Sequence, residues 1–265
     1  MKTKPFLAFL AFLALIVAGV MFYYRLPAEL LTRLSFYVGL ANPYVRIVKV
    51  QEGLRKEEIA EIFGEKLGWD EEEKSDFMNM HLALNTTDLE GRYFPDTYII
   101  PEDETPKEVA SIMLQEFSKE TSKIKKPASA DILNEEAVIR IASLIQREAG
   151  GKSDMNLISG ILWNRIWSGM KLQVDATLQY AKGSEEEGWW GKVKSEDKNI
   201  ESAYNTYIHK GLPPGPIANP GIAAIAAAYN PAKTECLFYL HDKNRKIHCT
   251  KTYEEHKKNI ERYYP

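Results

Sequence analysis

The stretch NEEAVIRIASLIQREA, which runs from Asn134 to Ala149, decides the fold around the candidate site, because its pattern predicts one amphipathic helix. Asn134 is a favourable N-cap, and the two glycines that follow Ala149 end the helix. Apolar residues recur at helical spacing and form one buried face: Val138, Ile141, Ala142, Ile145 and Ala149. At roughly 100° per residue, the side chain of Glu148 projects about 20° from that of Ile141, so this acid lies on the apolar face.

Glu148 is therefore expected to have a raised pKa. An apolar wall disfavours the charged carboxylate, and the negative end of the helix dipole disfavours it again. A carboxyl group with a raised pKa suits a general acid that works near neutral pH. The alternative interpretation is a partly exposed glutamate that pairs with an arginine near the helix end.

The composition indicates a protein with a sizeable core rather than a nucleic-acid binder. The chain has 265 residues, a formal net charge of -3 and 45% hydrophobic residues, which is enough for two modest domains after an N-terminal tail. Charges of both signs are mixed, which argues against a nucleic-acid partner. The five histidines show no close ligand spacing with the two cysteines, so we expect neither a metal site nor a cofactor.

An uncharged apolar run, Phe6 to Tyr24, predicts a single membrane-spanning helix. Its length as a helix would be roughly 28 Å, close to the thickness of a bilayer core. Lys2 and Lys4 precede the run, which predicts a cytoplasmic N-terminus and a chain that lies outside the inner membrane. A cleaved signal peptide is the alternative, but no small-x-small cleavage site follows the run. We therefore expect a cytoplasmic stub and transmembrane anchor at 1–25 and a stalk at 26–43.

The rest of the chain is expected to form an α+β protein in two parts. Tyr44 to Val50 alternates like a strand, and Arg55 to Leu67 predicts a short helix. The first part, 44–121, thus begins with a small β-α unit and continues into an aromatic-rich connector. A Lys/Pro/Ala-rich linker follows at 122–130. The second part, 131–265, begins with the amphipathic helix described above.

The second part is also predicted to contain a capped helix and a β-hairpin. Asp154 is predicted to cap a helix that starts at Met155. Further on, the strands LFYLH and KIHCT flank a polar turn near Asp242 and predict a hairpin. Cys236 and Cys249 flank this hairpin and are expected on the same face, either opposite or diagonal. A location outside the membrane permits a disulfide, but the sequence leaves the pairing open because the register is unknown.

A rigid loop carries polar side chains that suit a carbohydrate. The stretch YNTYIHKGLPPGPIANP, Tyr204 to Pro220, has a backbone fixed by proline and glycine. Asparagine and tyrosine offer both donors and acceptors, which sugar hydroxyls and N-acetyl amides require. The alternative interpretation is a structural Ω-loop.

Five motifs, in this order, resemble the endolytic murein transglycosylases, also known as MltG or YceG-like proteins. They are LEGRYFPDTY (Leu89 to Tyr98), ASLIQREAG (Ala142 to Gly150), LQVDATLQYAKG (Leu172 to Gly183), SAYNTYIHKGLPPGPIANPG (Ser202 to Gly221) and TYEEH (Thr252 to His256). The resemblance covers nearly the whole chain. It implies a single transmembrane helix, a small LysM-like β-α module that matches Tyr44 to Gly68, and a mixed α+β catalytic domain. The family's catalytic acid falls on Glu148, with Gln146 at the preceding acidic position of the motif.

The resemblance implies an enzyme that cuts peptidoglycan glycan strands at the β-1,4 bond between N-acetylmuramic acid and N-acetylglucosamine. Glu148 would protonate the bond oxygen and then take the proton of the C6 hydroxyl, which leaves a 1,6-anhydro-muramyl end and consumes no water. No cofactor is implied. Such an enzyme would end the elongation of nascent strands beside the membrane-bound synthesis machinery, the penicillin-binding proteins.

Six polar residues in these motifs are candidates for substrate contacts: Gln173, Asp175, Tyr204, Asn205, Tyr207 and Glu90. For Asp175 the alternative is a helix N-cap, and for Glu90 a structural hydrogen bond. Two other functions stay open. One is a hydrolytic muramidase, which would place a second carboxylate near Glu148. The other is a non-catalytic scaffold that binds peptidoglycan.

Overall fold

The computed structural model describes residues 3–24, 43–127 and 134–264. Helix α1 (Thr3–Tyr24) covers the uncharged apolar run, and its side chains are described for residues 10–20. Over the residues that the structure describes, no helix is long and apolar enough to cross a membrane. The transmembrane anchor stays a prediction. All but the last residue of the predicted stalk, 26–43, lies outside the described residues, as do the last three residues of the predicted linker.

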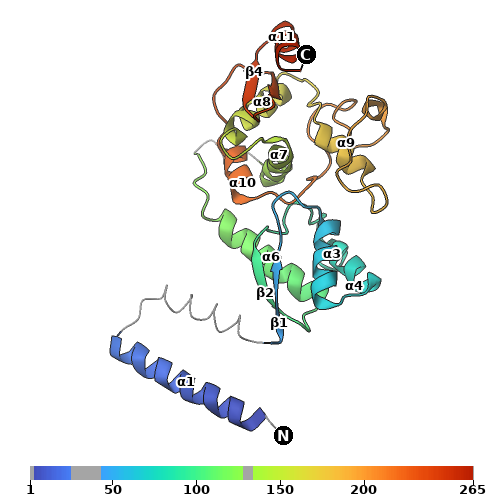
Figure 1. Ribbon diagram of the computed structural model, residues 1–265. Coiled ribbons are helices and arrows are strands. Elements are labelled where there is room, and N and C mark those ends of the chain that lie inside the picture. Colours follow the sequence, from blue (N-terminus) through green and yellow to red (C-terminus); the bar gives the residue numbers. More distant parts are fainter. Residues whose placement is uncertain (1–2, 25–42, 128–133, 265) are drawn as a thin grey trace.

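The first part of the chain is a two-stranded sheet packed with helices (Figure 1). Strand β1 (Val45–Lys49) pairs antiparallel with β2 (Thr97–Pro101), and Ile47 lies opposite Ile99. Around them lie helices α3 (Lys56–Leu67), α4 (Glu71–Met78), α5 (Met80–Ala83) and α6 (Pro106–Thr121). The predicted strand-turn-helix unit is therefore confirmed, whereas its assignment as LysM-like stays a prediction.

Apolar side chains from these elements form one core, made of Val48, Ile59, Phe63, Phe77, Tyr93, Ile100, Val109 and Met113 among others. Capping residues at the start of each helix explain where α4 and α6 begin. The Asp70 carboxylate accepts the backbone N–H of Glu73 at 2.9 Å, and Thr105 caps α6 with Pro106 as its first residue.

The second part is built on three packed helices, α7 (Glu135–Glu148), α8 (Met155–Trp167) and α10 (Ile222–Tyr229), with α9 (Asp175–Lys182) and the short 3₁₀ helix η2 (Glu196–Asn199) beside them (Figure 1). Helix α7 begins and ends as predicted, and Asn134 accepts the N–H of Glu136 at 2.9 Å. The apolar face of α7 is buried in the core of this part, with Ala149 at its end only partly buried. With α and β elements in both parts, the predicted α+β class is confirmed.

Asp154 is the N-cap residue of α8, which starts at Met155 as predicted, but its side chain makes no capping hydrogen bond to the helix. The carboxylate instead accepts the backbone N–H groups of Gly150 and Gly151, at 3.0 and 3.3 Å, and binds the ring of His241 at 2.7 Å. His241, from a distant strand, is thus the partner of this carboxylate in place of the helix N-terminus. The carboxylate in turn holds the turn that follows Glu148.

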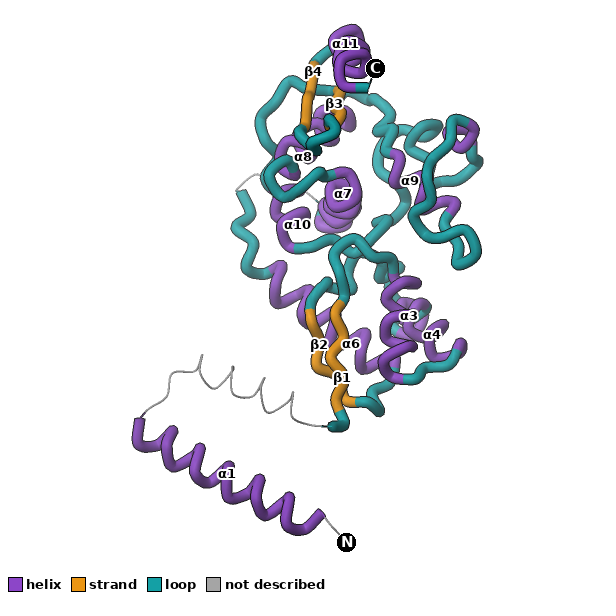
Figure 2. The backbone as a smooth tube through the Cα atoms, in the orientation of Figure 1, coloured by secondary structure: helices purple, strands orange, loops and turns teal. Residues whose placement is uncertain are grey.

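The chain ends in a hairpin and a helix that pack together (Figure 2). Strands β3 (Phe238–His241) and β4 (Ile247–Thr250) pair antiparallel, and α11 (Tyr253–Tyr263) follows. A disulfide joins Cys236 to Cys249, with their Cα atoms 5.8 Å apart. Tyr239 lies opposite Cys249, and Cys236 precedes β3. The two cysteines are therefore bonded without being an opposite or diagonal pair of the ladder, so the expected placement of the pair is wrong.

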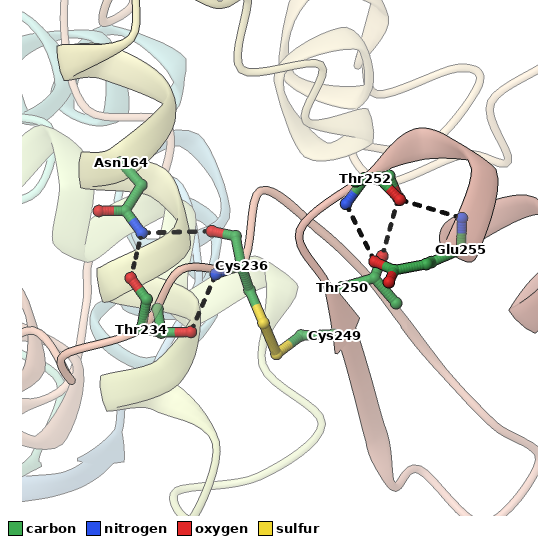
Figure 3. Close-up of a disulfide and its surroundings, with 7 residues drawn as sticks. All are labelled: Asn164, Thr234, Cys236, Cys249, Thr250, Thr252 and Glu255. Carbon is green, nitrogen blue, oxygen red and sulfur yellow. Dashed lines mark hydrogen bonds between the residues drawn. A yellow bond between two sulfur atoms is a disulfide. The ribbon is translucent and has the colours of Figure 1, made fainter.

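The hairpin is also attached to α8. The side-chain amide of Asn164 donates to the carbonyl oxygens of Thr234 and Cys236, at 2.8 and 3.2 Å (Figure 3). Directly after β4, Thr252 and Glu255 form a capping box that starts α11. The disulfide and these bonds together hold β3 against the three-helix core.

The two parts meet at the C-terminal end of α7. The guanidinium of Arg147 donates to the carbonyl oxygen of Gly53 at 3.2 Å and lies 3.6 Å from the ring centroid of Trp190. The indole N–H of Trp190 donates to Glu58 of α3 at 2.8 Å. The Trp-rich segment after α9 therefore docks on the first part of the chain and on Arg147, the residue that precedes Glu148.

Candidate active site

Glu148 is the last residue of α7, and strand β3 holds its carboxyl group. The hydroxyl of Tyr239 donates a hydrogen bond to Glu148 Oε2 at 2.6 Å. His241 is two residues further along the strand and binds Asp154, which in turn holds the N–H of Gly150. One strand thus fixes both the acid and the turn that follows it.

The groups around Glu148 shift the pKa of its carboxyl in both directions. Burial raises its pKa, and the charge of Asp175 raises it further. The hydrogen bond from Tyr239, the ring of His241 and the backbone N–H of Ala176 at the start of α9 lower it. The net pKa is raised, which confirms the direction expected from the sequence. Because the lowering groups stabilise the carboxylate, the site supports both protonation states.

Glu148 forms part of the wall of a cleft of about 360 Å³. The lining comes from α7, α8, the start of α9, the loop near Tyr207 and the C-terminal hairpin and helix. It consists of Glu148, Arg165, Leu172, Gln173, Asp175, Tyr207, Leu237, Phe238, Tyr239, Tyr253 and His256. Among the described residues, no group of three or more histidine, cysteine, aspartate and glutamate side chains could hold a metal ion.

Three predicted contact residues, Gln173, Asp175 and Tyr207, lie in this cleft with Glu148. Asp175 is the first residue of α9, and its carboxylate accepts the hydroxyl of Tyr207. Gln173 has a left-handed backbone, with φ at 56°, and its N–H donates to the carbonyl oxygen of Thr206 at 3.1 Å. A non-glycine residue in this conformation is held by its surroundings, as often happens at functional sites.

Asn205 and Tyr204 do not line the cleft. Asn205 is 0% exposed, and its side-chain amide donates to the carbonyl oxygens of Lys198 and Ile200 while accepting the N–H of Tyr207 at 2.8 Å. Tyr204 packs against Tyr180, with ring centroids 4.7 Å apart. Asn205 thus positions Tyr207. Direct sugar contacts by Asn205 and Tyr204 stay a prediction.

Glu90 also lies away from the cleft, where the two parts of the chain meet. It is 2% exposed, and its carboxyl accepts the amide of Asn219 at 2.6 Å and the N–H of Lys56 at 3.2 Å. Burial raises the pKa of Glu90 to about 8. Asn219 further bonds Leu54, so Glu90 belongs to a network that joins α3 to the loop before α10. A substrate contact by Glu90 stays a prediction.

Five cleft residues with a charged or aromatic side chain were not singled out from the sequence: Arg165, Phe238, Tyr239, Tyr253 and His256. Two of them belong to the TYEEH motif, and the Thr252 to Glu255 capping box marks the helix that carries them. The other three carry no local signal, because they become cleft residues only when the hairpin and α8 come together.

A cleft that joins a half-buried carboxylic acid to polar and aromatic side chains defines a protein equipped for acid-base chemistry on a polar substrate. The model of the YceG-like family matches residues 23–262, and the chain belongs to this family.

Relatives with described functions match part of the chain. An endolytic murein transglycosylase of Bacillus subtilis is 36% identical over 176 residues, which are 66% of this chain and 48% of that protein. One of Streptococcus pneumoniae is 32% identical over 174 residues, which are 65% of this chain and 32% of that protein. The matches thus span about half and about a third of these relatives.

The fold has a solved counterpart. A crystal structure of a YceG-like protein from Listeria monocytogenes matches with a TM-score of 0.71 and 27% identity, covering 80% of this chain and 75% of that one. The arrangement of elements described above is therefore one that this family adopts.

Proposed function

We propose that this protein is an endolytic lytic transglycosylase that cleaves peptidoglycan glycan strands, with Glu148 as its catalytic acid and base. The observation that carries the proposal is the environment of Glu148 in the cleft. Burial raises the pKa of the acid and so favours its protonated form, while the Tyr239 hydroxyl and the N–H of Ala176 lower the pKa and favour the carboxylate that forms after proton transfer. A single group that acts first as acid and then as base needs both forms to be accessible.

The reaction follows from these two states. Glu148 donates its proton to the oxygen of the β-1,4 bond between N-acetylmuramic acid and N-acetylglucosamine, and the bond from C1 to that oxygen breaks. An oxocarbenium-like centre forms at C1 and is stabilised by the N-acetyl group of the same sugar. The Glu148 carboxylate then removes the proton of the C6 hydroxyl, and O6 bonds to C1. The product is a 1,6-anhydro-muramyl end, and no water is consumed.

Residues around Glu148 fit roles in holding the sugar. Gln173 and Asp175 are exposed in the cleft on either side of Val174, and Tyr207 reaches them from the neighbouring loop. Their amide, carboxylate and phenol groups can pair with hydroxyl and N-acetyl groups. Asn205 acts indirectly, because its side-chain oxygen accepts the N–H of Tyr207.

A hydrolytic muramidase is the second candidate, because Asp175 puts another carboxylate in the same cleft. The two reactions give products that differ by one water. Purified glycan strands digested with the full chain and weighed by mass spectrometry should show anhydro ends. Hydrolysed ends would establish the muramidase. Binding of strands without any cleavage would leave a non-catalytic scaffold.

We further propose that α1 anchors the protein in the inner membrane, with the cleft outside the cytoplasm. Large apolar side chains on α1 are exposed, including Phe12, Leu15 and Ile16, and a bilayer would cover them. The disulfide agrees with an oxidising compartment. There the enzyme would cut nascent strands beside penicillin-binding proteins and end their elongation. A reporter fused after Pro265 should be active only outside the cytoplasm, and activity inside would overturn this topology.

A further inference from the structure

Arg165 is a buried cation in the cleft that the proposed reaction does not use. It projects from α8, is 7% exposed and lines the same cleft as Glu148. Its guanidinium donates to the carbonyl oxygen of Leu172 and, at 3.1 Å, to the side-chain oxygen of Gln173. Its Nε is buried and has no hydrogen-bond partner among the residues that the structure describes.

No carboxylate in the described part of the chain forms an ion pair with Arg165. Burial lowers the pKa of its guanidinium, which shows that the charged form is desolvated. Burying a charge without a counter-ion is unfavourable, and proteins usually supply a partner. The neutral oxygens of Leu172 and Gln173 satisfy part of the hydrogen-bonding capacity but none of the charge.

An aromatic cluster surrounds this cation. The Arg165 guanidinium lies 5.3 Å from the ring centroid of Phe238, and Phe238 packs against Tyr253 and His256 at 5.7 and 5.6 Å. All three rings line the cleft. The Nδ1 atom of His256 is also buried without a partner in the described part of the chain, and burial lowers the pKa of this ring, which favours its neutral form. Arg165 is thus the cation that faces the cleft from this side.

We propose that Arg165 recognises a carboxylate of the muramyl unit, so that the cleft distinguishes N-acetylmuramic acid from N-acetylglucosamine. The proposal rests on the proposed function. The two sugars differ by the lactyl ether on O3 of N-acetylmuramic acid, which ends in a free carboxyl group on strands without stem peptides. The ring carbon C3 that carries this ether is two ring positions from C1, where the bond to the oxygen that Glu148 protonates is attached. A guanidinium binds a carboxylate through charge-assisted hydrogen bonds, and a desolvated cation makes the strongest ones.

Gln173 completes the arrangement. Its side-chain oxygen accepts from Arg165, and its amide NH₂ group has no hydrogen-bond partner in the described part of the chain, so it is free to donate to a substrate acceptor in the cleft. Arg165 therefore selects the anionic group directly and orients a neutral donor beside it.

The carboxylate has two sources on natural strands, and the experiment separates them. The full chain is tested on three forms of one glycan preparation. Strands freed of peptide carry lactyl carboxylates. The same strands coupled to methylamine carry neutral amides. Strands that keep their stem peptides carry a neutral lactyl amide and carboxylates further out. Cleavage is measured as kcat/KM, and binding is measured separately as Kd in the Glu148→Gln background, which does not depend on turnover.

The lactyl carboxylate strands should be preferred over the methylamide strands by about tenfold or more, as expected for a hydrogen bond between charged groups. Arg165→Gln should reduce this ratio to about one, and Arg165→Lys, which keeps the charge, should retain part of it. Arg140→Gln is the matched control, because Arg140 also has a buried unpartnered Nε but does not line the cleft. A preference for peptide-bearing strands that Arg165→Gln removes would assign the site to stem carboxylates.

Two results would overturn the proposal. One is an equal Kd of the Glu148→Gln protein for all three forms, and the other is a preference that survives Arg165→Gln. The failure of the proposed function is distinct, because it would appear as a lack of anhydro ends in the wild type whatever the Kd ratio is. If Arg165→Gln proves unstable, the Arg165→Lys ratio still decides the outcome, since a structural role alone would leave that ratio at the wild-type value.

Discussion

Glu148 and Glu90 are two carboxyl groups with raised pKa values in two regions of the molecule. Both owe the raised pKa first to burial. Glu148 lies on the wall of a cleft and is bonded by a phenol from a distant strand. Glu90 lies at the junction between the two parts, and both of its oxygens accept hydrogen bonds from the protein. A raised pKa thus identifies a desolvated acid, and only access to a cleft makes that acid available to a substrate.

The largest expected effect is on strand cleavage, which should fall when Glu148 is replaced but not when Glu90 is replaced. Glu148→Gln should lower strand cleavage by about 10²–10⁴-fold, because the amide cannot donate and recover a proton. Glu90→Gln is the matched control and should stay within a few-fold of the wild type, since its side chain does not reach the cleft. Cleavage is measured by release of soluble fragments from purified strands. More than about a tenth of wild-type activity in Glu148→Gln would remove this residue from the mechanism.

The second prediction concerns stability against pH. Glu90 has a folded-state pKa of about 8, above its ordinary value, so its stabilising contribution is complete below about pH 4.5 and is lost as the pH rises through 8. Between pH 5 and 8 the wild type should lose at most about 1.4 kcal/mol of unfolding free energy per pH unit from this group. Urea unfolding at several pH values measures the slope.

Glu90→Gln should flatten this slope, because the amide does not titrate. Glu254→Gln, a change on the exposed surface of α11, serves as the control and should leave the slope as it is. An unchanged slope in Glu90→Gln would show that the junction does not hold this acid in its neutral form.

The third prediction tests the disulfide at the hairpin that forms part of the cleft wall. Replacing Cys236 and Cys249 together by serine should lower the free energy of unfolding by about 3 kcal/mol, because the bond closes a loop with a sequence separation of 13. Since the hairpin carries Tyr239, cleavage should fall as well, whereas the pH slope due to Glu90 should persist. Urea unfolding at pH 7 with and without a reducing agent provides the measurement. Equal stability of the oxidised and reduced wild type would contradict it.

The smallest expected effect is a shift in the pKa of Glu148 when its hydrogen bond from Tyr239 is removed. Tyr239→Phe removes a hydrogen bond that lowers the pKa of this carboxyl, so the pKa should rise further. The acid form then persists to higher pH, and the alkaline limb of kcat/KM against pH should move up by about one unit. Tyr253→Phe removes a hydroxyl from the same cleft that does not bond Glu148, and its profile should stay in place. A shift toward lower pH in Tyr239→Phe would reverse the assigned role of the hydroxyl.

Sequence patterns predicted what is local in this molecule. The cap at Asn134, the apolar spacing along α7 and the position of Glu148 all follow from neighbouring residues, and the structure has them as expected. The β-α unit of the first part was predictable for the same reason.

The partners of the site were not predictable, because they come from far along the chain. Tyr239 bonds Glu148 across 91 residues, and His241 reaches Asp154 across 87. Asp154 has the residue type and position of a cap, yet its tertiary partners outweigh the local one. The cysteine pairing depended on where the strand ladder ends, which no alternation pattern specifies.

The left-handed backbone at Gln173 has a consequence for engineering. An L-residue in this conformation costs roughly 1–2 kcal/mol, a strain that asparagine or glycine would relieve. A selection for heat resistance alone would therefore favour Gln173→Asn or Gln173→Gly. Either change shortens or removes the amide that accepts from Arg165. Substitutions at position 173 that raise thermal stability should therefore lower activity. Thermostable variants should be screened for glycan cleavage as well as for melting temperature.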